Sequence, residues 1–378
     1  MGDTMKIGIL TFIGVENCGA LLQAYALNQK LKEFGNEVEL INLISNNEYE
    51  RKNKSSLKNR AFLARKIYYL MHFKSIKKRK IMFNKFREEY LPIYPKERKI
   101  YESELADICK KYNCLVCGSD QIWSQDPKLY DRSDAYFINF QFDGKRVSYA
   151  ASFGDNLDYA EKNKNHIIPF IQKFDSVSVR ETIAKEFLNN NDIKCEVTID
   201  PTLLISKTEW EKISILPNIK EDYILYFSVN SRKYSINVAK KLSKRTGLKV
   251  IEINPHPKSW NSGFKKKYGI GPREFLGYIL NAKYIVTNSF HGTVFSILFN
   301  KPFLAAFDEK EGKLVKENRK YTLLEMLKLQ DCIMTESKMI DLSIINKICW
   351  EEINNNLENI KKESINYLKK NVYNGGIK

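Results

Sequence analysis

The stretch at residues 5–43, MKIGILTFIGVENCGALLQAYALNQKLKEFGNEVELINL, constrains the fold most, because it reads as strand, loop, helix and strand. Ile7, Ile9 and Leu10 predict the first strand, and the helix is expected to end at Gly35. The apolar residues of the helix recur at helical spacing: Ala20, Ala24, Leu27 and Leu31. This pattern predicts a βαβ unit. Its loop lacks the Gly-x-Gly-x-x-Gly fingerprint, so the unit is weak evidence for a dinucleotide site.

Further strands with polar ends follow along the chain. They are predicted within CLVCGSDQIW (114–123), RVSYAASFG (146–154), FDSVSVRE (174–181) and CEVTIDPTLLI (195–205). Residues 206–222 are polar and predict a linker, after which DYILYFSVN (222–230) begins a second α/β series. We therefore expect an α/β protein with two Rossmann-like domains facing each other across a cleft. The expected divisions are an N-terminal domain at 1–205, a C-terminal domain at 206–340 and a helical tail at 341–378.

Composition excludes several classes of protein. The chain of 378 residues suits two domains, and it has no apolar run of the ~18 residues that a membrane span needs. The N-terminus lacks a signal-peptide pattern, so we expect a cytoplasmic protein whose seven cysteines are reduced. Cys114 and Cys117 lie in a predicted strand, where side chains three apart point to opposite faces, so buried thiols are favoured over a metal site. The four histidines show no metal-binding spacing, and no metal is expected.

Most of the formal net charge of +17 is concentrated at residues 51–99, where 17 Lys and Arg residues face three Glu residues. Apolar and aromatic side chains are interleaved with the cations, which predicts basic amphipathic helices. Such a segment could lie on an anionic membrane surface, follow a phosphate-bearing substrate or contact nucleic acid. It could equally be a solvated helical face. No signature of a nucleic-acid-binding module is present, so nucleic acid is not an expected partner.

The segment TNSFHGTVFSILFNKPF, residues 287–303, places a histidine between a strand and a helix. The strand is predicted at 284–287 and the helix from Thr293 to the residues before Pro302. His291 then lies at the carboxyl end of a strand, where open α/β sheets bind ligands. The alternative is a loop histidine that caps local carbonyls.

Six stretches together resemble the polysaccharide pyruvyl transferase family, and they occur in the family's order. They are NCGALLQAYAL (17–27), GSDQIW (118–123), SYAASFG (148–154), SVRE (178–181), DPTLL (200–204) and SFHGTVFSILFNKP (289–302). The resemblance implies a fold like that of GT-B glycosyltransferases. It also implies transfer of the enolpyruvyl group of phosphoenolpyruvate onto two hydroxyls of a sugar, which gives a pyruvate ketal and releases phosphate. No cofactor is expected beyond this donor.

By position, the resemblance places the family's histidine at His291 and a donor-binding arginine at Arg180. Several characterised members carry arginine two residues before the histidine, where this chain has Ser289. A guanidinium grips carboxylate or phosphate through two parallel bonds and a serine does not, so the change bears on the donor. The expected donor-binding residues are Arg180, Asn288, Ser289, Gly292 and Thr293.

Protonation of the donor's methylene carbon needs a general acid, and His291 suits this role since its ordinary pKa is near neutral. Asp120 is a candidate base for the sugar hydroxyls, with an Asp that closes its own turn as the alternative.

Asn17, Gly19, Trp123 and Tyr149 are expected on the acceptor side. Asn17 could instead cap the helix and Trp123 could lie in the core. Arg180 could also pair with Glu181 or another surface acid.

The partners expected are phosphoenolpyruvate, a saccharide acceptor that is free or lipid-linked, and an anionic membrane surface contacted through residues 51–99. The second hypothesis is a glycosyltransferase of the same fold that uses a nucleotide sugar. The residue at position 289 makes this alternative relevant, because it changes the expected grip on the donor.

Overall fold

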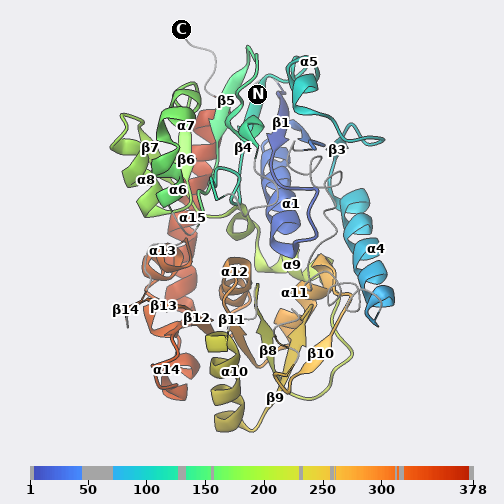
Figure 1. The fold of residues 1–378 in the computed structure, drawn as a ribbon, viewed down its shortest axis with the longest axis vertical. Coiled ribbons are helices and arrows are strands. Elements are labelled where there is room, and N and C mark those ends of the chain that lie inside the picture. Colours follow the sequence, from blue (N-terminus) through green and yellow to red (C-terminus); the bar gives the residue numbers. More distant parts are fainter. Residues whose placement is uncertain are drawn as a thin grey trace, which may run out of the picture.

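A computed structural model describes residues 4–44, 71–126, 133–154, 157–229, 233–255, 259, 261–310, 313–314 and 319–373. Two parallel sheets, one in each half of the chain, form its centre (Figure 1). Part of the predicted basic segment, residues 51–70, lies outside the described residues. So does one of the four histidines, His256.

The first sheet has the order β3-β2-β1-β4-β5, with all neighbours parallel. Its strands are β1 (Lys6–Leu10), β2 (Glu37–Ile41), β3 (Ile93–Tyr94), β4 (Cys114–Cys117) and β5 (Lys145–Ser148). Isolated bridges continue it to the parallel pair β6 (Val177–Val179) and β7 (Cys195–Val197). Successive residues of β1 pack on opposite faces, because side chains alternate along a strand. Both faces of this sheet are therefore buried.

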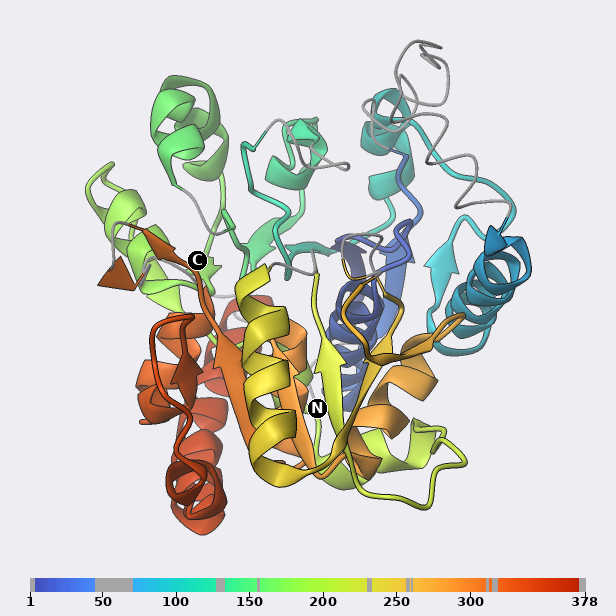
Figure 2. The same cartoon turned by 60° about the horizontal axis from the view of Figure 1, so that its bottom comes forward.

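The second sheet has the order β10-β9-β8-β11-β12-β15 and is also parallel. Its strands are β8 (Tyr223–Phe227), β9 (Lys249–Ile253), β10 (Lys265–Lys267), β11 (Tyr284–Thr287), β12 (Phe303–Ala306) and β15 (Ile333–Met334). Two short antiparallel strands, β13 (Glu309–Lys310) and β14 (Lys313–Leu314), form a separate pair. Figure 2 shows α10 (Lys233–Thr246) against one face of this sheet, where Val238 and Leu242 are buried. These findings confirm the predicted α/β class with two parallel sheets.

The remaining helices cover the sheets and their edges. In the first half they are α1 (Cys18–Glu33), α4 (Phe73–Tyr90), α5 (Leu105–Cys109), α6 (Asp158–Lys162), α7 (Lys164–Ile171) and α8 (Thr182–Asn189). In the second half they are α9 (Lys207–Ile213), α11 (Pro272–Asn281), α12 (Phe290–Leu298), α13 (Arg319–Met326), α14 (Leu342–Asn346) and α15 (Trp350–Tyr373). Short 3₁₀ turns include Pro201–Leu204, which follows β7. Among the described helices, none is long and apolar enough to cross a membrane.

Two helices connect the halves (Figure 1). The C-terminal helix α15 returns to the first half, where Tyr367 donates to the Ser148 carbonyl at 3.0 Å and Asn371 accepts from the Ser176 hydroxyl at 2.6 Å. Helix α4 buries Phe83 and Phe86 and contacts α11. His72, just before α4, stacks on Tyr268 of the second half with 4.4 Å between ring centroids. The two halves of the chain are therefore in contact at two separate places.

Two element predictions need correction. Residues 206–222, expected as a linker, include helix α9, because Ser206 and Glu209 form a capping box and Trp210 is buried. The helix expected from Thr293 begins three residues earlier, at Phe290, because the Ser289 hydroxyl accepts from the Gly292 N–H. His291 consequently lies in the first turn of α12 and not in the loop before it.

Candidate functional site

The carboxyl ends of the strands bring the predicted residues together. The strand order reverses between β1 and β4 in the first sheet and between β8 and β11 in the second, and parallel sheets form ligand crevices at such points. Asp120 follows β4, Arg180 follows β6 and His291 follows β11. The side chains that meet here come from both halves of the chain.

A buried carboxylate, Asp200, is the centre of the cluster. Its Oδ2 accepts from Arg180 Nη1 at 2.6 Å and from the Ser119 hydroxyl at 3.2 Å. Its Oδ1 accepts from the N–H and the hydroxyl of Thr202 at 3.0 and 2.6 Å. Burial alone raises the pKa of Asp200, but the adjacent His291 and Arg180 outweigh it and hold the pKa well below its ordinary value. The carboxylate is therefore ionised at neutral pH.

His291 reaches this carboxylate from the second half of the chain. Its Nε2 lies 3.5 Å from Asp200 Oδ2, and the side chain is 9% exposed. Nε2 has no hydrogen-bond partner within the described residues. A buried ring nitrogen beside a carboxylate and a guanidinium is placed for proton transfer to an incoming ligand.

Gly19 determines how closely His291 can approach. A Cβ built at Gly19 would lie 2.0 Å from His291 Nδ1 and 2.4 Å from its Cγ, which no real contact allows. The preceding Asn17 caps α1, since its Oδ1 accepts from the N–H groups of Gly19 and Ala20 at 2.9 and 3.3 Å. The capping alternative for Asn17 is thus confirmed. Gly19 packs against the histidine, and its predicted contact with the acceptor stays a prediction.

Asp120 lies in a turn held by α1. Gln23 of α1 donates to the Thr11 hydroxyl at 2.8 Å and accepts from the Ser119 N–H at 3.1 Å. Asp120 Oδ1 accepts from the next N–H, that of Gln121, at 2.9 Å, so it does close its own turn. The same oxygen lies 3.8 Å from Arg180 Nη2. Asp120 therefore closes its own turn and also lies beside the cluster.

Arg180 is buried and does not lie at the surface, so its expected alternative as a surface ion pair is wrong. Its side chain is 2% exposed because Asp200 compensates its charge, and its Cζ lies 4.4 Å from the centroid of Phe290. Burial lowers the pKa of Arg180, but Asp200, Glu181 and Asp120 together raise it above its usual value. Its Nε and Nη2 have no hydrogen-bond partner within the described residues.

A second guanidinium, that of Arg319 in α13, lies 5.5 Å from the same Phe290 ring. Gln121, in the amide orientation that satisfies both groups, accepts from Arg319 Nη1 and from Nη2 at 2.6 Å. Arg319 thus joins the two halves at the cluster. Sequence reasoning missed it, since nothing in its local sequence marks it. Asp200 was also missed as a site residue, although the Asp-Pro-Thr sequence at a strand end was a visible signal.

The four predicted donor-binding residues around His291 are engaged locally. Asn288 Oδ1 accepts from the Val229 N–H at 2.9 Å, and Ser289 caps α12. Gly292 and Thr293 were expected to bind the anionic donor, and open N–H groups in the first turn of the helix would serve that role. In the structure these two N–H groups donate to the side chain and the carbonyl of Ser289. That expectation is corrected for these two N–H groups, because the side chain and the carbonyl of Ser289 already accept from them.

Trp123 and Tyr149, predicted on the acceptor side, are buried in the core at 0% exposure. Trp123 donates to the Tyr136 carbonyl at 3.0 Å, and Tyr149 donates to the Ile199 carbonyl at 2.9 Å. Trp123 therefore lies in the core, as the alternative prediction for this residue stated. Neither aromatic ring is open to a sugar there.

All seven cysteines are free thiols, and six of them, including Cys114 and Cys117, are buried. The described residues contain no group of three or more His, Cys, Asp or Glu side chains placed to hold a metal ion. The titratable and charged groups at the cluster are His291, Asp200, Asp120 and the guanidinium groups of Arg180 and Arg319.

The family model for polysaccharide pyruvyl transferases matches residues 17–309. The chain belongs to the polysaccharide pyruvyl transferase family. The match covers most of the chain and includes every residue of the cluster described above except Arg319. The chain is therefore a transferase enzyme, as the motif order predicted. A comparison with curated proteins found no match.

Solved structures show the fold. The UDP-GlcNAc 2-epimerase from Neisseria meningitidis bound to UDP-GlcNAc is 12% identical, with 97% of this chain and 100% of that chain covered and a TM-score of 0.51. The UDP-GlcNAc 2-epimerase from Methanocaldococcus jannaschii is also 12% identical, with 94% and 92% covered and a TM-score of 0.50. The likeness extends over both sheets, which confirms the GT-B-like arrangement that the sequence predicted.

Proposed function

We propose that this member of the family transfers the enolpyruvyl group of phosphoenolpyruvate onto two hydroxyls of a saccharide in cell-surface polysaccharide synthesis, which forms a pyruvate ketal. The observation that carries the proposal is the buried Arg180 guanidinium, which presents Nε and Nη2 without a hydrogen-bond partner among the described residues. Buried donors of this kind are costly unless a ligand uses them. A carboxylate or phosphate of the donor would satisfy both N–H groups through paired bonds.

His291 is the proposed general acid. Its Nε2 is the ring nitrogen that faces Asp200, and the same Asp200 oxygen accepts from Arg180. A donor anion held by Arg180 would therefore lie on the Nε2 side of the ring. Asp200 stabilises the imidazolium and orients the ring, and Thr202 and Ser119 hold Asp200 in place.

The reaction balances with these groups. A proton from His291 adds to the donor's methylene carbon and leaves positive charge on the carbon that bears phosphate and carboxylate. One sugar hydroxyl bonds to that carbon and loses its proton, phosphate leaves, and the second hydroxyl closes the ketal and loses its proton. Asp120 lies beside Arg180 and is the proposed base for the hydroxyls. Of the two protons that the hydroxyls release, one restores the protonated His291 and the other leaves with the phosphate.

Helix α4 supports the proposed contact with an anionic membrane surface at the inner face. Phe73 and Ile81 of this helix are 64% and 55% exposed, and lysines lie between them in the sequence. Exposed apolar side chains among cations are the features of a helix that lies in a membrane interface. We expect binding to anionic vesicles at low salt, weakened in Phe73→Ser and Ile81→Ser. Met339→Ser, at an apolar residue 79% exposed elsewhere, is the control. Equal binding to neutral and anionic vesicles would contradict the contact.

The test of the function compares phosphoenolpyruvate with UDP and GDP in thermal unfolding. A ligand at 100 times its Kd stabilises the native state by about 2.7 kcal/mol, which is about 3 °C for a chain of this length. Phosphoenolpyruvate should produce this shift, and the shift should disappear in Arg180→Lys, which keeps the charge but loses the fork.

Transfer itself is measured by phosphate release when phosphoenolpyruvate is mixed with saccharide acceptors. His291→Gln should bind the donor and release no phosphate. Stabilisation by a nucleotide and not by phosphoenolpyruvate would refute the proposal and favour the nucleotide-sugar alternative.

A further inference from the structure

Two arginines from different halves of the chain meet at the ring of Phe290. The Cζ atom of Arg180 lies 4.4 Å from the ring centroid and that of Arg319 lies 5.5 Å from it. Because both distances are measured to one point, the two Cζ atoms are at most about 10 Å apart. Phe290 is buried and directly precedes His291. A second guanidinium therefore lies close to the proposed general acid and to the proposed donor-binding arginine.

The turn after β4 independently places Arg319 at the cluster, since three successive residues of this turn each contact one of its charged groups. They are Ser119, which donates to Asp200 at 3.2 Å, Asp120, which lies 3.8 Å from Arg180, and Gln121, which accepts from Arg319. The same short segment of the first half therefore reaches both guanidinium groups.

The contact of Arg319 with this turn is made to a neutral group. In the amide orientation that satisfies both side chains, the Gln121 oxygen accepts from Nη1 of Arg319 and from Nη2 at 2.6 Å. Both terminal nitrogens thus point toward one acceptor at the junction of the two halves. Hydrogen bonds to an ionised acceptor are about twice as strong as those to a neutral one. An anion that reaches the Phe290 ring can therefore replace the amide with a net gain.

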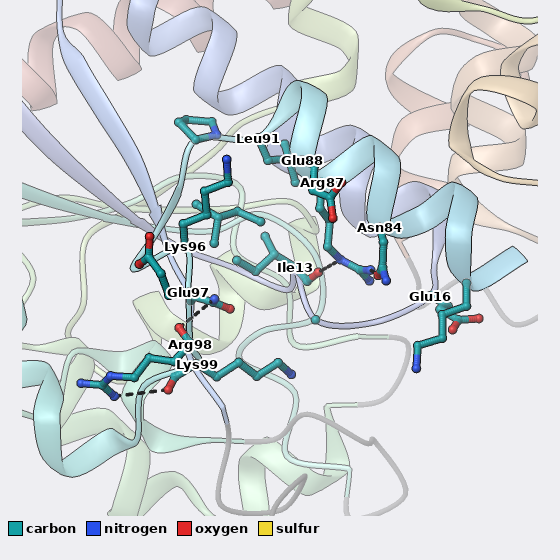
Figure 3. Close-up of a pocket in the computed structure, with 15 residues that line it drawn as sticks. Ile13, Glu16, Asn84, Arg87, Glu88, Leu91, Lys96, Glu97, Arg98 and Lys99 are labelled. Atoms are coloured by element: carbon teal, nitrogen blue, oxygen red, sulfur yellow. Dashed lines mark hydrogen bonds between the residues drawn. The ribbon is translucent and has the colours of Figure 1, made fainter. Parts of the chain in front are cut away.

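A cavity of about 580 Å³ in the first half of the chain also contains basic side chains (Figure 3). One of them, Arg87, is engaged in the cavity wall, where it donates to the carbonyls of Ile13 and Val15 at 2.7 and 2.8 Å. Neither Arg180 nor Arg319 lines this cavity. Its basic residues are therefore separate from the two guanidinium groups at the ring.

We propose that Arg319 is a donor-binding residue, which holds one anionic group of phosphoenolpyruvate while Arg180 holds the other. The donor then takes the place of Gln121 on Arg319. The inference rests on the proposed function and adds a residue to the same site. Phosphoenolpyruvate carries its phosphate and its carboxylate on one carbon, so the two anionic groups are close together. Each guanidinium can bind one of them through paired hydrogen bonds.

The test measures the affinity of the full chain for phosphoenolpyruvate by calorimetry. Arg319→Gln should weaken binding by about tenfold or more, the usual effect of a lost charge-assisted contact, and Arg319→Lys, which keeps the charge, should weaken it less. Arg273→Gln is the matched control. The Arg273 Cζ also lies 5.5 Å from an aromatic ring, that of Tyr90 in the other half, and its Nε donates to the Ile213 carbonyl at 2.8 Å. This control should bind phosphoenolpyruvate as the parent chain does.

Gln121→Met separates donor binding from a purely structural role of Arg319. If Arg319 served only to hold the two halves together, loss of either partner of this contact would weaken donor binding equally. Since the donor must displace the amide, Gln121→Met should bind phosphoenolpyruvate at least as tightly as the parent chain. Equal weakening in Gln121→Met and Arg319→Gln overturns the proposal, and so does an unchanged affinity in Arg319→Gln.

Inorganic phosphate and pyruvate, measured separately, identify the group that Arg319 holds. Weaker phosphate binding in Arg319→Gln supports the proposal with the phosphate on Arg319, and weaker pyruvate binding supports it with the carboxylate there. Phosphoenolpyruvate binding that persists in Arg319→Gln but is lost in Arg180→Lys refutes the role of Arg319 alone. A parent chain that does not bind phosphoenolpyruvate refutes the proposed function, and the role of Arg319 with it.

Discussion

Replacement of Gly19 by alanine tests the contact that joins the two halves at His291. The added Cβ would lie 2.0 Å from His291 Nδ1 and 2.7 Å from its Cε1. The ring must move by about 1.4 Å to reach an ordinary contact distance. Such a shift also disturbs the approach of Nε2 to Asp200, now 3.5 Å. We expect Gly19→Ala to cost about 1–3 kcal/mol of stability, as overpacking of a buried site does.

The same displacement should reduce transfer strongly. A misplacement of about 1 Å in a catalytic group can cost about 100-fold in rate. Chemical unfolding gives the stability, and phosphate release from phosphoenolpyruvate gives the activity. The destabilisation should depend on the imidazole, so it should disappear in a His291→Ala background. Alanine is favoured over glycine within a helix by about 0.5–1 kcal/mol, and only that gain should remain there.

Gly8→Ala is the control for this double-mutant cycle. Its Cβ would lie 2.7 Å from a Leu115 methyl group in the first sheet, away from His291. Its cost should therefore be the same with and without the imidazole, because separated sites are additive. If Gly19→Ala costs equally in both backgrounds, or costs nothing, the close packing of Gly19 on His291 is wrong.

Three further predictions concern residues at or near the cluster and the thiols. Ser289→Ala should lower the unfolding free energy by about 1 kcal/mol, since it removes the cap of α12, while Ser289→Asp, which can still cap, should restore it in denaturant titrations. Asp200→Asn should be less stable than the parent chain at pH 7, and the difference should begin to shrink below about pH 4, because the stability from a depressed carboxyl pKa is complete above the pKa of the unfolded chain and is lost gradually as the pH falls toward the pKa of the folded chain; a difference that stays constant from pH 7 to pH 2 would contradict the assignment. Under native conditions, the exposed Cys349 should react first with a thiol reagent. Burial raises the pKa of Cys18 and Cys332 to about 12, so these two thiols should stay unlabelled until the chain unfolds. Mass mapping that finds Cys18 or Cys332 labelled early would refute this prediction.

The sequence predicted the frame of the site because local patterns specify it. The β-branched run at β11, followed by Asn-Ser, marks a strand end whatever the rest of the chain does. The same reasoning placed Arg180 after β6. The predicted start of helix α12 was wrong, because a serine two residues before a histidine is equally compatible with a loop residue and with a helix cap.

Burial could not be read locally. Trp123 and Tyr149 follow strands, as aromatic residues in a sugar site would, and yet both are fully buried. The periodicity of a strand predicts which side chains alternate between the two faces of the sheet. It does not predict whether a residue after the end of the strand is exposed, because that depends on the elements that pack over it. The predicted acceptor contacts of these two aromatic residues therefore had no local observation that could distinguish them from core packing.

The departure at Ser289 shows how a site can differ from a motif while keeping its charge. The resemblance implies arginine at this position in several characterised members, so the motif of this chain, with serine there, has one cation fewer. In space, Arg180 and Arg319 flank the same Phe290 ring, with their Cζ atoms 4.4 and 5.5 Å from its centroid. Arg319 comes from α13, after the segment that the family model matches, so no comparison of motifs pairs it with position 289. Phe290, which carries this ring, lies between Ser289 and His291. Arg319 therefore brings a second guanidinium to the site from α13, which lies outside the motif.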